Sequence, residues 1–278
     1  MPVLTLSTRT VGYSDEGSGA PILLVHGSAT SRRFWKGIAA ELARTHRVLA
    51  VDLHGCGESS PWPAGRMLAP SDEGELIGAV ADRAGGPVHL VGHSYGGALA
   101  AEYAARHADR VASLVLIEPS AFNLLHAPGD AALRAEIEDL ALQHIALVIH
   151  GRVADAAALF MSYWIGAAAW HAMPELRRSA IVEAMPKVAA EWRLVFFRLG
   201  GISTYARLKA RTTLICGGAT TRPSRRIVEI VRAVLPNAAF VEIAQAGHMA
   251  PLTHAAAVAA ALVGHVAGCA AQSESRAA

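Results

Sequence analysis

The sequence is poor in the features that mark several classes of protein. Its 278 residues contain only three cysteines, and the wide spacing of Cys56, Cys216 and Cys269 excludes a disulfide framework and a zinc-binding pattern. No histidine spacing indicates a metal site, so no metal is expected. The net charge is +2 without a dense basic cluster, so nucleic acid is not expected as a partner. Every run of about 18 residues is interrupted by a charge, glycine or proline, so no membrane-spanning helix is expected.

The N-terminus lacks an apolar stretch behind a basic start, so we expect no signal peptide in residues 1–10. Together with the scarcity of cysteine, this favours a cytoplasmic protein. The chain is rich in apolar residues: 53% of its residues are hydrophobic and only 17% are charged. This composition is sufficient for a substantial core. The length suits one large α/β domain with an insertion, or two small domains.

Six short apolar runs have the length and composition of buried parallel strands, and segments with a helical pattern alternate with them. The strands are expected at Pro21–Val25, Arg47–Val51, Val88–Val91, Val111–Ile117, Thr212–Cys216 and Ala239–Ile243. The helices are expected at Arg32–Arg44, Asp72–Ala84, Tyr95–His107, Ser224–Leu235 and His254–Val266. This alternation predicts a mostly parallel, doubly wound sheet covered by helices on both faces.

The alternation stops between about residues 120 and 207, where no strand-like run occurs. Leu133 and Ile137 begin a series of apolar residues at helical spacing, and Pro174 and Pro186 divide the rest into several helices. This segment and the final helix both offer surfaces for a homodimer. The expected layout is a core of residues 1–119 and 208–278, an inserted helical cap of residues 120–207, and a flexible tail of residues 268–278.

Ser94 lies at the most informative point of the chain. It follows the expected strand Val88–Val91, stands between Gly92 and Gly96 in a G-x-S-x-G pattern, and precedes the helix former Ala98–Arg106. A strand, a sharp turn and a helix in this order are typical of a nucleophile elbow, in which the glycines leave room for a strained backbone. The pattern predicts that Ser94 is a nucleophile.

A serine hydroxyl is a poor nucleophile unless a base removes its proton and a third group orients that base. We expect the base to be a histidine on a loop after the last strand. His248, in the loop that follows Ala239–Ile243, occupies that position. The alternative is a structural role for His248.

A serine nucleophile also needs two backbone N–H groups to stabilise the oxyanion. The first is expected from Tyr95, the residue after the nucleophile at a helix N-terminus. The second is expected from the loop after Val25, where Ser28 is the best candidate.

With these residues in this order, the chain resembles the α/β hydrolases over nearly its whole length. The matching segments are His26–Gly27, the loop Asp52–Ser59, the elbow at Ser94, the helical cap and Gly247–His248. The resemblance implies the α/β-hydrolase fold and a hydrolase that needs no cofactor and carries a cap over its site. The family includes esterases, lipases, lactonases, C–C bond hydrolases, epoxide hydrolases, haloalkane dehalogenases and perhydrolases. The epoxide and haloalkane groups carry aspartate at the elbow, so Ser94 disfavours both.

The acid of the family pattern is missing from its usual position. Family members usually have an aspartate shortly after the strand that corresponds to Thr212–Cys216, but here Thr220 stands at that position. No aspartate occurs anywhere after Asp155. The acid is therefore either absent or supplied from elsewhere.

Glu118 is the candidate replacement, because it comes directly after a core strand and some α/β hydrolases supply the acid from this strand end. We expect Pro119 to hold Glu118 in an extended conformation as the strand ends. Three alternatives stay open: Glu118 forms a structural salt bridge, Glu242 or Glu229 is the acid, or no acid is present.

We therefore expect a serine hydrolase that cleaves a carboxylic ester or a related acyl compound through Ser94, His248 and Glu118. Its substrate is expected to be a small apolar molecule held by aromatic residues of the cap region, namely Trp164, Phe160, Trp192 and Phe122. The alternatives are a C–C bond hydrolase or lactonase with the same three residues, and a non-catalytic ligand-binding protein on the same scaffold.

Overall fold

A single eight-stranded sheet forms the centre of the molecule in the computed structural model, which describes residues 2–6, 9–62 and 65–277, with side chains up to residue 271. The strand order is β1-β2-β4-β3-β5-β6-β7-β8. The strands are β1 (Val3–Leu6), β2 (Arg9–Gly17), β3 (Pro21–Val25), β4 (Arg47–Val51), β5 (Val88–His93), β6 (Val111–Ile117), β7 (Arg211–Gly217) and β8 (Ala239–Ile243). The six strands from β3 onward pair in parallel, which confirms the predicted mostly parallel sheet.

The first two strands pair antiparallel at one edge and were not predicted. Strand β2 is the reason, because its second half contains Ser14, Asp15 and Glu16 and is largely exposed. A strand that borders solvent carries no continuous apolar run, so its sequence does not look like a buried strand.

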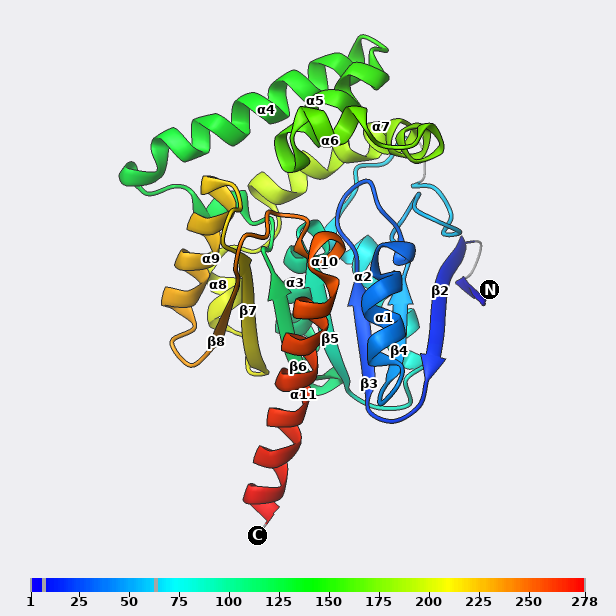
Figure 1. Cartoon of the computed structure of the whole chain (residues 1–278), viewed down its shortest axis with the longest axis vertical. Helices are drawn as coiled ribbons and strands as arrows, with labels where there is room; N and C mark the ends of the chain where they lie inside the picture. The colour runs from blue at the N-terminus through cyan, green and yellow to red at the C-terminus, as the bar shows by residue number, and fades with distance from the viewer. Residues whose placement is uncertain (1, 7–8, 63–64, 278) are drawn as a thin grey trace.

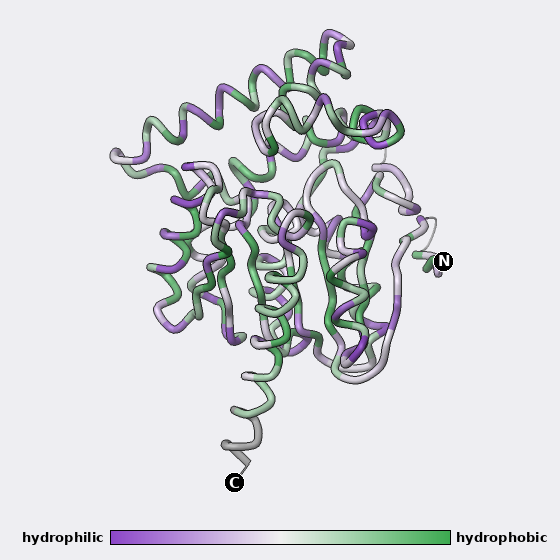
Figure 2. The backbone as a smooth tube through the Cα atoms, viewed as in Figure 1, coloured by the Kyte–Doolittle hydropathy of each residue, from purple (hydrophilic) through white to green (hydrophobic). Residues whose placement is uncertain are grey.

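Side chains on successive residues of the central strands enter two separate cores. In β3, Leu23 and Val25 join one apolar cluster, whereas Ile22 and Leu24 join the other. Helices α1 (Lys36–Leu42) and α11 (Ala255–Ala277) cover the second cluster. The first cluster is covered by α2 (Pro70–Asp82), α3 (Tyr95–Arg106), α8 (Ile202–Ala206) and α9 (Arg222–Val234). Figure 2 shows the strands between these layers as mostly hydrophobic.

A group of helices is inserted between β6 and β7 and lies over the carboxyl ends of the parallel strands (Figure 1, top). These cap helices are α4 (Ala131–Ile149), α5 (Val153–Ile165), α6 (Ala167–His171) and α7 (Glu175–Phe197). Helix α8, which the expected boundary assigns to the cap, packs instead on α3 and α9. Short 3₁₀ turns occupy Arg32–Trp35, Ala108–Arg110, Phe122–Leu124 and Pro128–Asp130, and a short helix α10 spans Ala250–Thr253.

Helix α11 is much longer than its expected range. Its backbone continues as a helix to Ala277 and so includes residues 268–277 of the segment 268–278, for which the sequence predicts a flexible tail. The side chains of residues 272–278 lie outside the described part, and the flexibility of the tail stays a prediction. Within the described residues, no helix is both long and apolar enough to cross a membrane.

Candidate active site

Ser94 occupies the sharp turn between β5 and α3. Its φ of 55° and ψ of −122° lie in a region that a residue with a side chain rarely adopts. The turn is tight because the chain reverses onto its own helix, and a Cβ atom at Gly92 would collide with the backbone of Gly96 and Gly97. Two backbone hydrogen bonds hold the turn: Ser94 donates to the Ile117 carbonyl at 3.0 Å, and Ser120 donates to the Ser94 carbonyl at 3.0 Å.

Three side chains predicted from the sequence meet at this turn. Ser94 Oγ lies 2.9 Å from His248 Nε2, and His248 Nδ1 lies 2.6 Å from Glu118 Oε2. All three residues are buried, with exposed fractions of 8%, 3% and 1% for Ser94, His248 and Glu118. When Nδ1 carries a proton and donates it to Glu118, Nε2 is free to accept the proton of Ser94. The arrangement can therefore transfer a proton from the serine to the histidine.

Glu118 lies at the end of β6 and reaches across to the next strand. Its Oε1 accepts a hydrogen bond from Gly217 N at 2.7 Å, and its Oε2 accepts one from Thr220 Oγ1 at 2.6 Å. Burial raises the pKa of this carboxyl, but the hydrogen bonds from His248, Thr220 and Gly217 outweigh that cost and leave the pKa below its usual 4.5. Thr220, the residue at the usual acid position, thus stabilises the carboxylate of Glu118.

The expectation that Glu118 is extended is wrong. Its φ is +44°, in the left-handed region, although Pro119 follows it. Glu118 N donates to the Ile215 carbonyl of β7 at 3.1 Å, so the backbone turns at this residue while still bonded to the neighbouring strand. This turn lets the side chain lie between His248 and the end of β7.

The alternative acids lie elsewhere. Glu242 accepts a hydrogen bond from Arg225 at 2.9 Å, with nearly half of its side chain exposed. Glu229 pairs with Arg226 at 3.4 Å on an exposed face of α9. The contact with His248 belongs to Glu118.

Two aromatic rings pack near the imidazole of His248. The Trp164 ring from the cap lies 4.2 Å from it, centre to centre, at an interplanar angle of 30°. The His93 ring lies 4.9 Å away, and His93 Nε2 donates to the His248 carbonyl at 2.8 Å. Burial and the neighbouring His248 lower the pKa of His93 to about 3, which keeps His93 neutral. These contacts give His93 a packing role in the elbow.

The loop after β3 is held tightly against the elbow. His26 Nε2 accepts a hydrogen bond from Leu53 N at 3.1 Å, so the proton on Nδ1 points back to the Gly27 carbonyl at 2.8 Å. A Cβ on Gly27 would lie 3.1 Å from the Ser94 Cβ, which shows how closely the two loops approach. Ser28 follows and lines the space in front of Ser94, and Tyr95 begins α3 behind it. The structure thus brings both expected oxyanion residues next to Ser94.

An ion cluster around the buried Arg32 and Asp52 fixes the neighbouring loop. The Arg32 guanidinium pairs with Asp52, and its other end lies 2.8 Å from Glu58 Oε2. Asp52 also accepts hydrogen bonds from the backbone N–H of Arg32 at 2.7 Å and of Glu58 at 3.0 Å. Asp52 and Glu58 therefore organise the loop.

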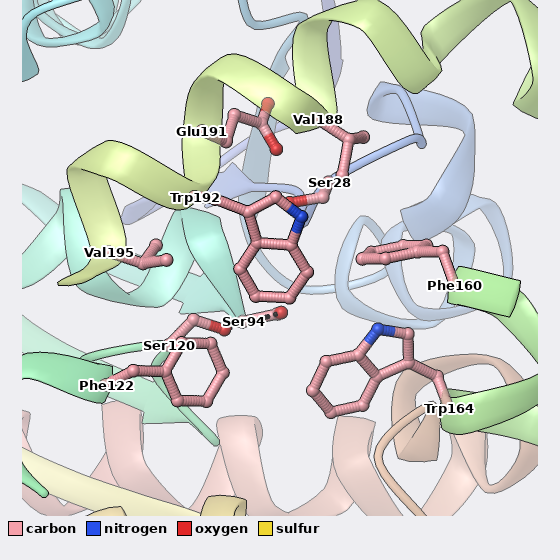
Figure 3. Close-up of a pocket in the computed structure, with 10 residues that line it drawn as sticks. All are labelled: Ser28, Ser94, Ser120, Phe122, Phe160, Trp164, Val188, Glu191, Trp192 and Val195. Atoms are coloured by element: carbon pink, nitrogen blue, oxygen red, sulfur yellow. Dashed lines mark hydrogen bonds between the residues drawn. The ribbon is translucent and has the colours of Figure 1, made fainter. Parts of the chain in front are cut away.

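Two cavities have Ser94 in their lining. A small inner chamber of about 20 Å³ lies beneath α7, and Figure 3 shows the side chains around it. A larger cleft of about 760 Å³ runs outward between the cap and the loop after β3, and His248 lines it. All four predicted pocket residues line the chamber: Trp164, Phe160, Trp192 and Phe122.

Two residues near the site were missed by sequence reasoning. Ser120 Oγ lies 3.0 Å from Ser94 Oγ, and Glu191 of α7 lines the chamber although it is charged and only 3% exposed. The position of Ser120, two residues after the candidate acid, was a usable signal. Glu191 gave no such signal, because the residues around it predict only an ordinary helix. Among the described residues, no group of three or more His, Cys, Asp or Glu side chains is placed to hold a metal ion.

Comparison with known proteins places these features in a wider group. Residues 22–261 match the model of the alpha/beta hydrolase family. The chain is 34% identical to a haloalkane dehalogenase of Sphingobium indicum over 119 residues, which are 41% of this chain and 40% of that protein. It is 38% identical to lipase LipV of Mycobacterium tuberculosis over 101 residues, which are 36% of this chain and 38% of that protein. The matches thus span about two fifths of these curated relatives.

Solved structures resemble the chain over almost its full length. MGS-M2, an alpha/beta hydrolase enzyme from a Medee basin deep-sea metagenome library, has a TM-score of 0.81 at 16% identity, and the match covers 96% of this chain and 97% of that one. A thermophilic esterase from Thermogutta terrifontis has a TM-score of 0.72 at 23% identity, covering 97% and 99%. At these identities the likeness concerns the fold alone.

Proposed function

Since the chain belongs to the alpha/beta hydrolase family, we propose that it hydrolyses a carboxylic ester with Ser94 as nucleophile, His248 as general base and Glu118 as the acid that orients His248. The observation that carries this proposal is the continuous line of contacts from Ser94 Oγ to His248 Nε2 at 2.9 Å and from His248 Nδ1 to Glu118 at 2.6 Å. These contacts join a nucleophile, a base and an orienting group in that order, which is the arrangement needed for acyl transfer.

In the first half of the reaction, Ser94 Oγ attacks the ester carbonyl carbon and His248 Nε2 takes the serine proton. The new C–O bond places a negative charge on the former carbonyl oxygen, to which the backbone N–H groups of Ser28 and Tyr95 donate. The ionised carboxylate of Glu118 stabilises the imidazolium of His248. The bond to the alcohol then breaks, and His248 returns the proton to the leaving oxygen.

In the second half, a water molecule attacks the acyl group on Ser94, and His248 takes a proton from that water. The bond between Ser94 Oγ and the acyl carbon breaks, and the proton passes from His248 to Ser94. The products are one carboxylic acid and one alcohol, and the three residues return to their starting state.

The serine at the elbow argues against the reaction named for some relatives. Displacement of a halide from a saturated carbon by Ser94 would leave an alkyl ether, which lacks the carbonyl that water attacks in the second half of the reaction. A carboxylate nucleophile instead leaves an ester that water can cleave. A carbonyl substrate is therefore the one that Ser94 can turn over.

Labelling with a fluorophosphonate tests this proposal, because such probes react with a serine only when its hydroxyl is activated. The intact mass of the wild-type protein should increase by one probe adduct. The adduct should disappear in Ser94→Ala and persist in Ser120→Ala, the matched control whose hydroxyl is 3.0 Å away. Circular dichroism establishes that each variant is folded.

Two results would contradict the proposal. An adduct that persists in Ser94→Ala would place the reactive serine elsewhere. A folded wild-type protein that forms no adduct would favour a ligand-binding protein on this scaffold.

A further inference from the structure

The two cavities at Ser94 differ in one respect that bears on substrate binding: His248 lines the outer cleft and does not belong to the set that lines the inner chamber. In ester cleavage the base must return its proton to the leaving alcohol, so the alcohol has to lie on the histidine side. The acyl group then extends to the opposite side of Ser94. This assigns the alcohol to the outer cleft and the acyl group to the inner chamber.

The inner chamber admits only a short acyl group. Its volume of about 20 Å³ is close to that of a site for a single water molecule. Bulky side chains enclose it, with Trp192 near the centre of the view and Phe122 and Phe160 on either side (Figure 3). Val188, which is 2% exposed, forms part of the wall toward α7. One or two atoms beyond the carbonyl carbon fill this space.

Glu191, an acidic residue, is one of the residues that line this chamber. Glu191 is 3% exposed, and its Oε1 accepts a hydrogen bond from Lys187 Nζ at 2.6 Å. Its Oε2 is buried and has no hydrogen-bond partner among the described residues. A buried carboxylate oxygen without a donor is costly, so a donor from a bound molecule would be favoured there.

The charges around Glu191 also favour a donor. Lys187 lies 2.9 Å from Glu73 as well as 2.6 Å from Glu191, so two carboxylates share one ammonium group. Lys187 is buried, which lowers its pKa, but the two carboxylates raise that pKa well above its usual value. The ammonium thus stays protonated and keeps Oε1 of Glu191 occupied.

We propose that the inner chamber binds a two-carbon acyl group that carries a hydrogen-bond donor next to the carbonyl, such as a hydroxyl, and that Glu191 accepts this donor through Oε2. Glu191 is then a specificity-determining residue, and the substrate class is an ester of a short hydroxy acid with a larger alcohol. This inference rests on the proposed ester hydrolysis at Ser94.

The test compares kcat/KM for three esters with one alcohol: benzyl glycolate, benzyl chloroacetate and benzyl acetate. The chloroacetyl group withdraws electrons but cannot donate a hydrogen bond. Each kcat/KM is divided by the rate at which hydroxide hydrolyses the same ester, which corrects for the intrinsic reactivity of that ester. We expect the wild type to prefer glycolate over chloroacetate by about 10- to 100-fold, the range for a hydrogen bond to a charged group.

Glu191→Gln is the informative variant because it keeps the size of the side chain. Because the Lys187 ammonium needs an acceptor, the amide oxygen of the glutamine faces Lys187 and its NH₂ group faces the chamber. The NH₂ group cannot accept a hydrogen bond from the hydroxyl of the substrate. The glycolate preference should disappear. Glu175→Gln, at the exposed start of the same helix, is the matched control and should leave the ratio unchanged.

Chain length provides a second readout. Val188→Ala removes two methyl groups from the wall of the chamber, and we expect it to raise kcat/KM for benzyl butanoate relative to benzyl acetate by about tenfold, the gain for one or two methylenes in an apolar pocket.

The outcomes separate the inference from the function on which it rests. A wild type that cleaves acetate but does not prefer glycolate would overturn the inference and leave ester hydrolysis standing. An equal loss on all three esters in Glu191→Gln, or an unchanged chain-length ratio in Val188→Ala, would also overturn it. A folded wild type that cleaves none of the esters would refute the proposed function and the inference together.

Discussion

Replacing Glu118 by glutamine tests the relocated acid most directly. The carboxylate accepts from three donors: Gly217 N on Oε1, and both Thr220 Oγ1 and His248 Nδ1 on Oε2. An amide has only one acceptor oxygen, so its NH₂ must face either the Gly217 N–H or the pair formed by Thr220 and His248. In the second case the NH₂ donates to His248 Nδ1. The proton of the imidazole then moves to Nε2, where it blocks transfer from Ser94.

The size of the effect follows from this change of tautomer. Replacement of the triad aspartate by asparagine lowers kcat by about 10⁴-fold in a serine protease with a Ser-His-Asp triad. A reduction of about 10³- to 10⁴-fold in Glu118→Gln corresponds to an activation barrier higher by about 4 to 5.5 kcal/mol. Thr220→Val is the matched control, since it removes one donor to Oε2 but leaves His248 oriented. We expect it to lower kcat about 3- to 10-fold, as for loss of one hydrogen bond.

The assay is steady-state hydrolysis of an ester, with thermal unfolding to establish that both variants fold. If folded Glu118→Gln keeps a third or more of the wild-type kcat, the orienting role of Glu118 is refuted. If Thr220→Val is as inactive as Glu118→Gln, the acid function is shared between the two residues, and the assignment to Glu118 alone is wrong.

Two further predictions concern stability. Gly92→Ala should lower the free energy of unfolding by about 1–3 kcal/mol or more, because the new Cβ would collide with the backbone of Gly96 and Gly97. A midpoint of urea unfolding equal to that of the wild type would contradict this prediction. Burial lowers the pKa of His26 to about 4 and that of His93 to about 3, from the usual 6.5. Below pH 6.5 the unfolded chain therefore binds protons that the folded chain does not. As the pH falls, the free energy of unfolding should decrease by up to about 1.4 kcal/mol per pH unit for each histidine. This decrease should end when the pH reaches the pKa of each histidine in the folded protein. Denaturation curves that coincide between pH 7 and pH 5 would show that these histidines are not buried as described.

Much of the fold could be predicted because its central strands are buried on both faces. The bounds expected for Pro21–Val25, Arg47–Val51 and Val111–Ile117 are those of β3, β4 and β6. A strand covered on both faces is a continuous apolar run, and glycine or polar residues mark its ends. The edge strand β2 has no such run, and its pairing with β4 depends on backbone hydrogen bonds that leave no trace in the side chains.

The site could be predicted as far as topology determines it. Ser94, Glu118 and His248 each follow a parallel strand, and the carboxyl ends of these strands meet at one edge of the sheet. The positive φ of Glu118 could not be predicted, because tertiary hydrogen bonds to β7 outweigh the local preference of a residue before proline. The position of Glu191 in the chamber could not be predicted either, because it depends on how the cap packs and not on any local pattern.

The order of the site residues along the chain has a consequence for how the protein is made. Ser94 and Glu118 both precede the cap, whereas His248 follows β8, the last strand and one edge of the sheet. During synthesis from the N-terminus, the serine and the acid are complete while their histidine is still missing. Under the proposed mechanism, the emerging chain therefore carries an inert serine until β8 pairs with β7, and the onset of ester cleavage marks the moment at which the sheet is finished.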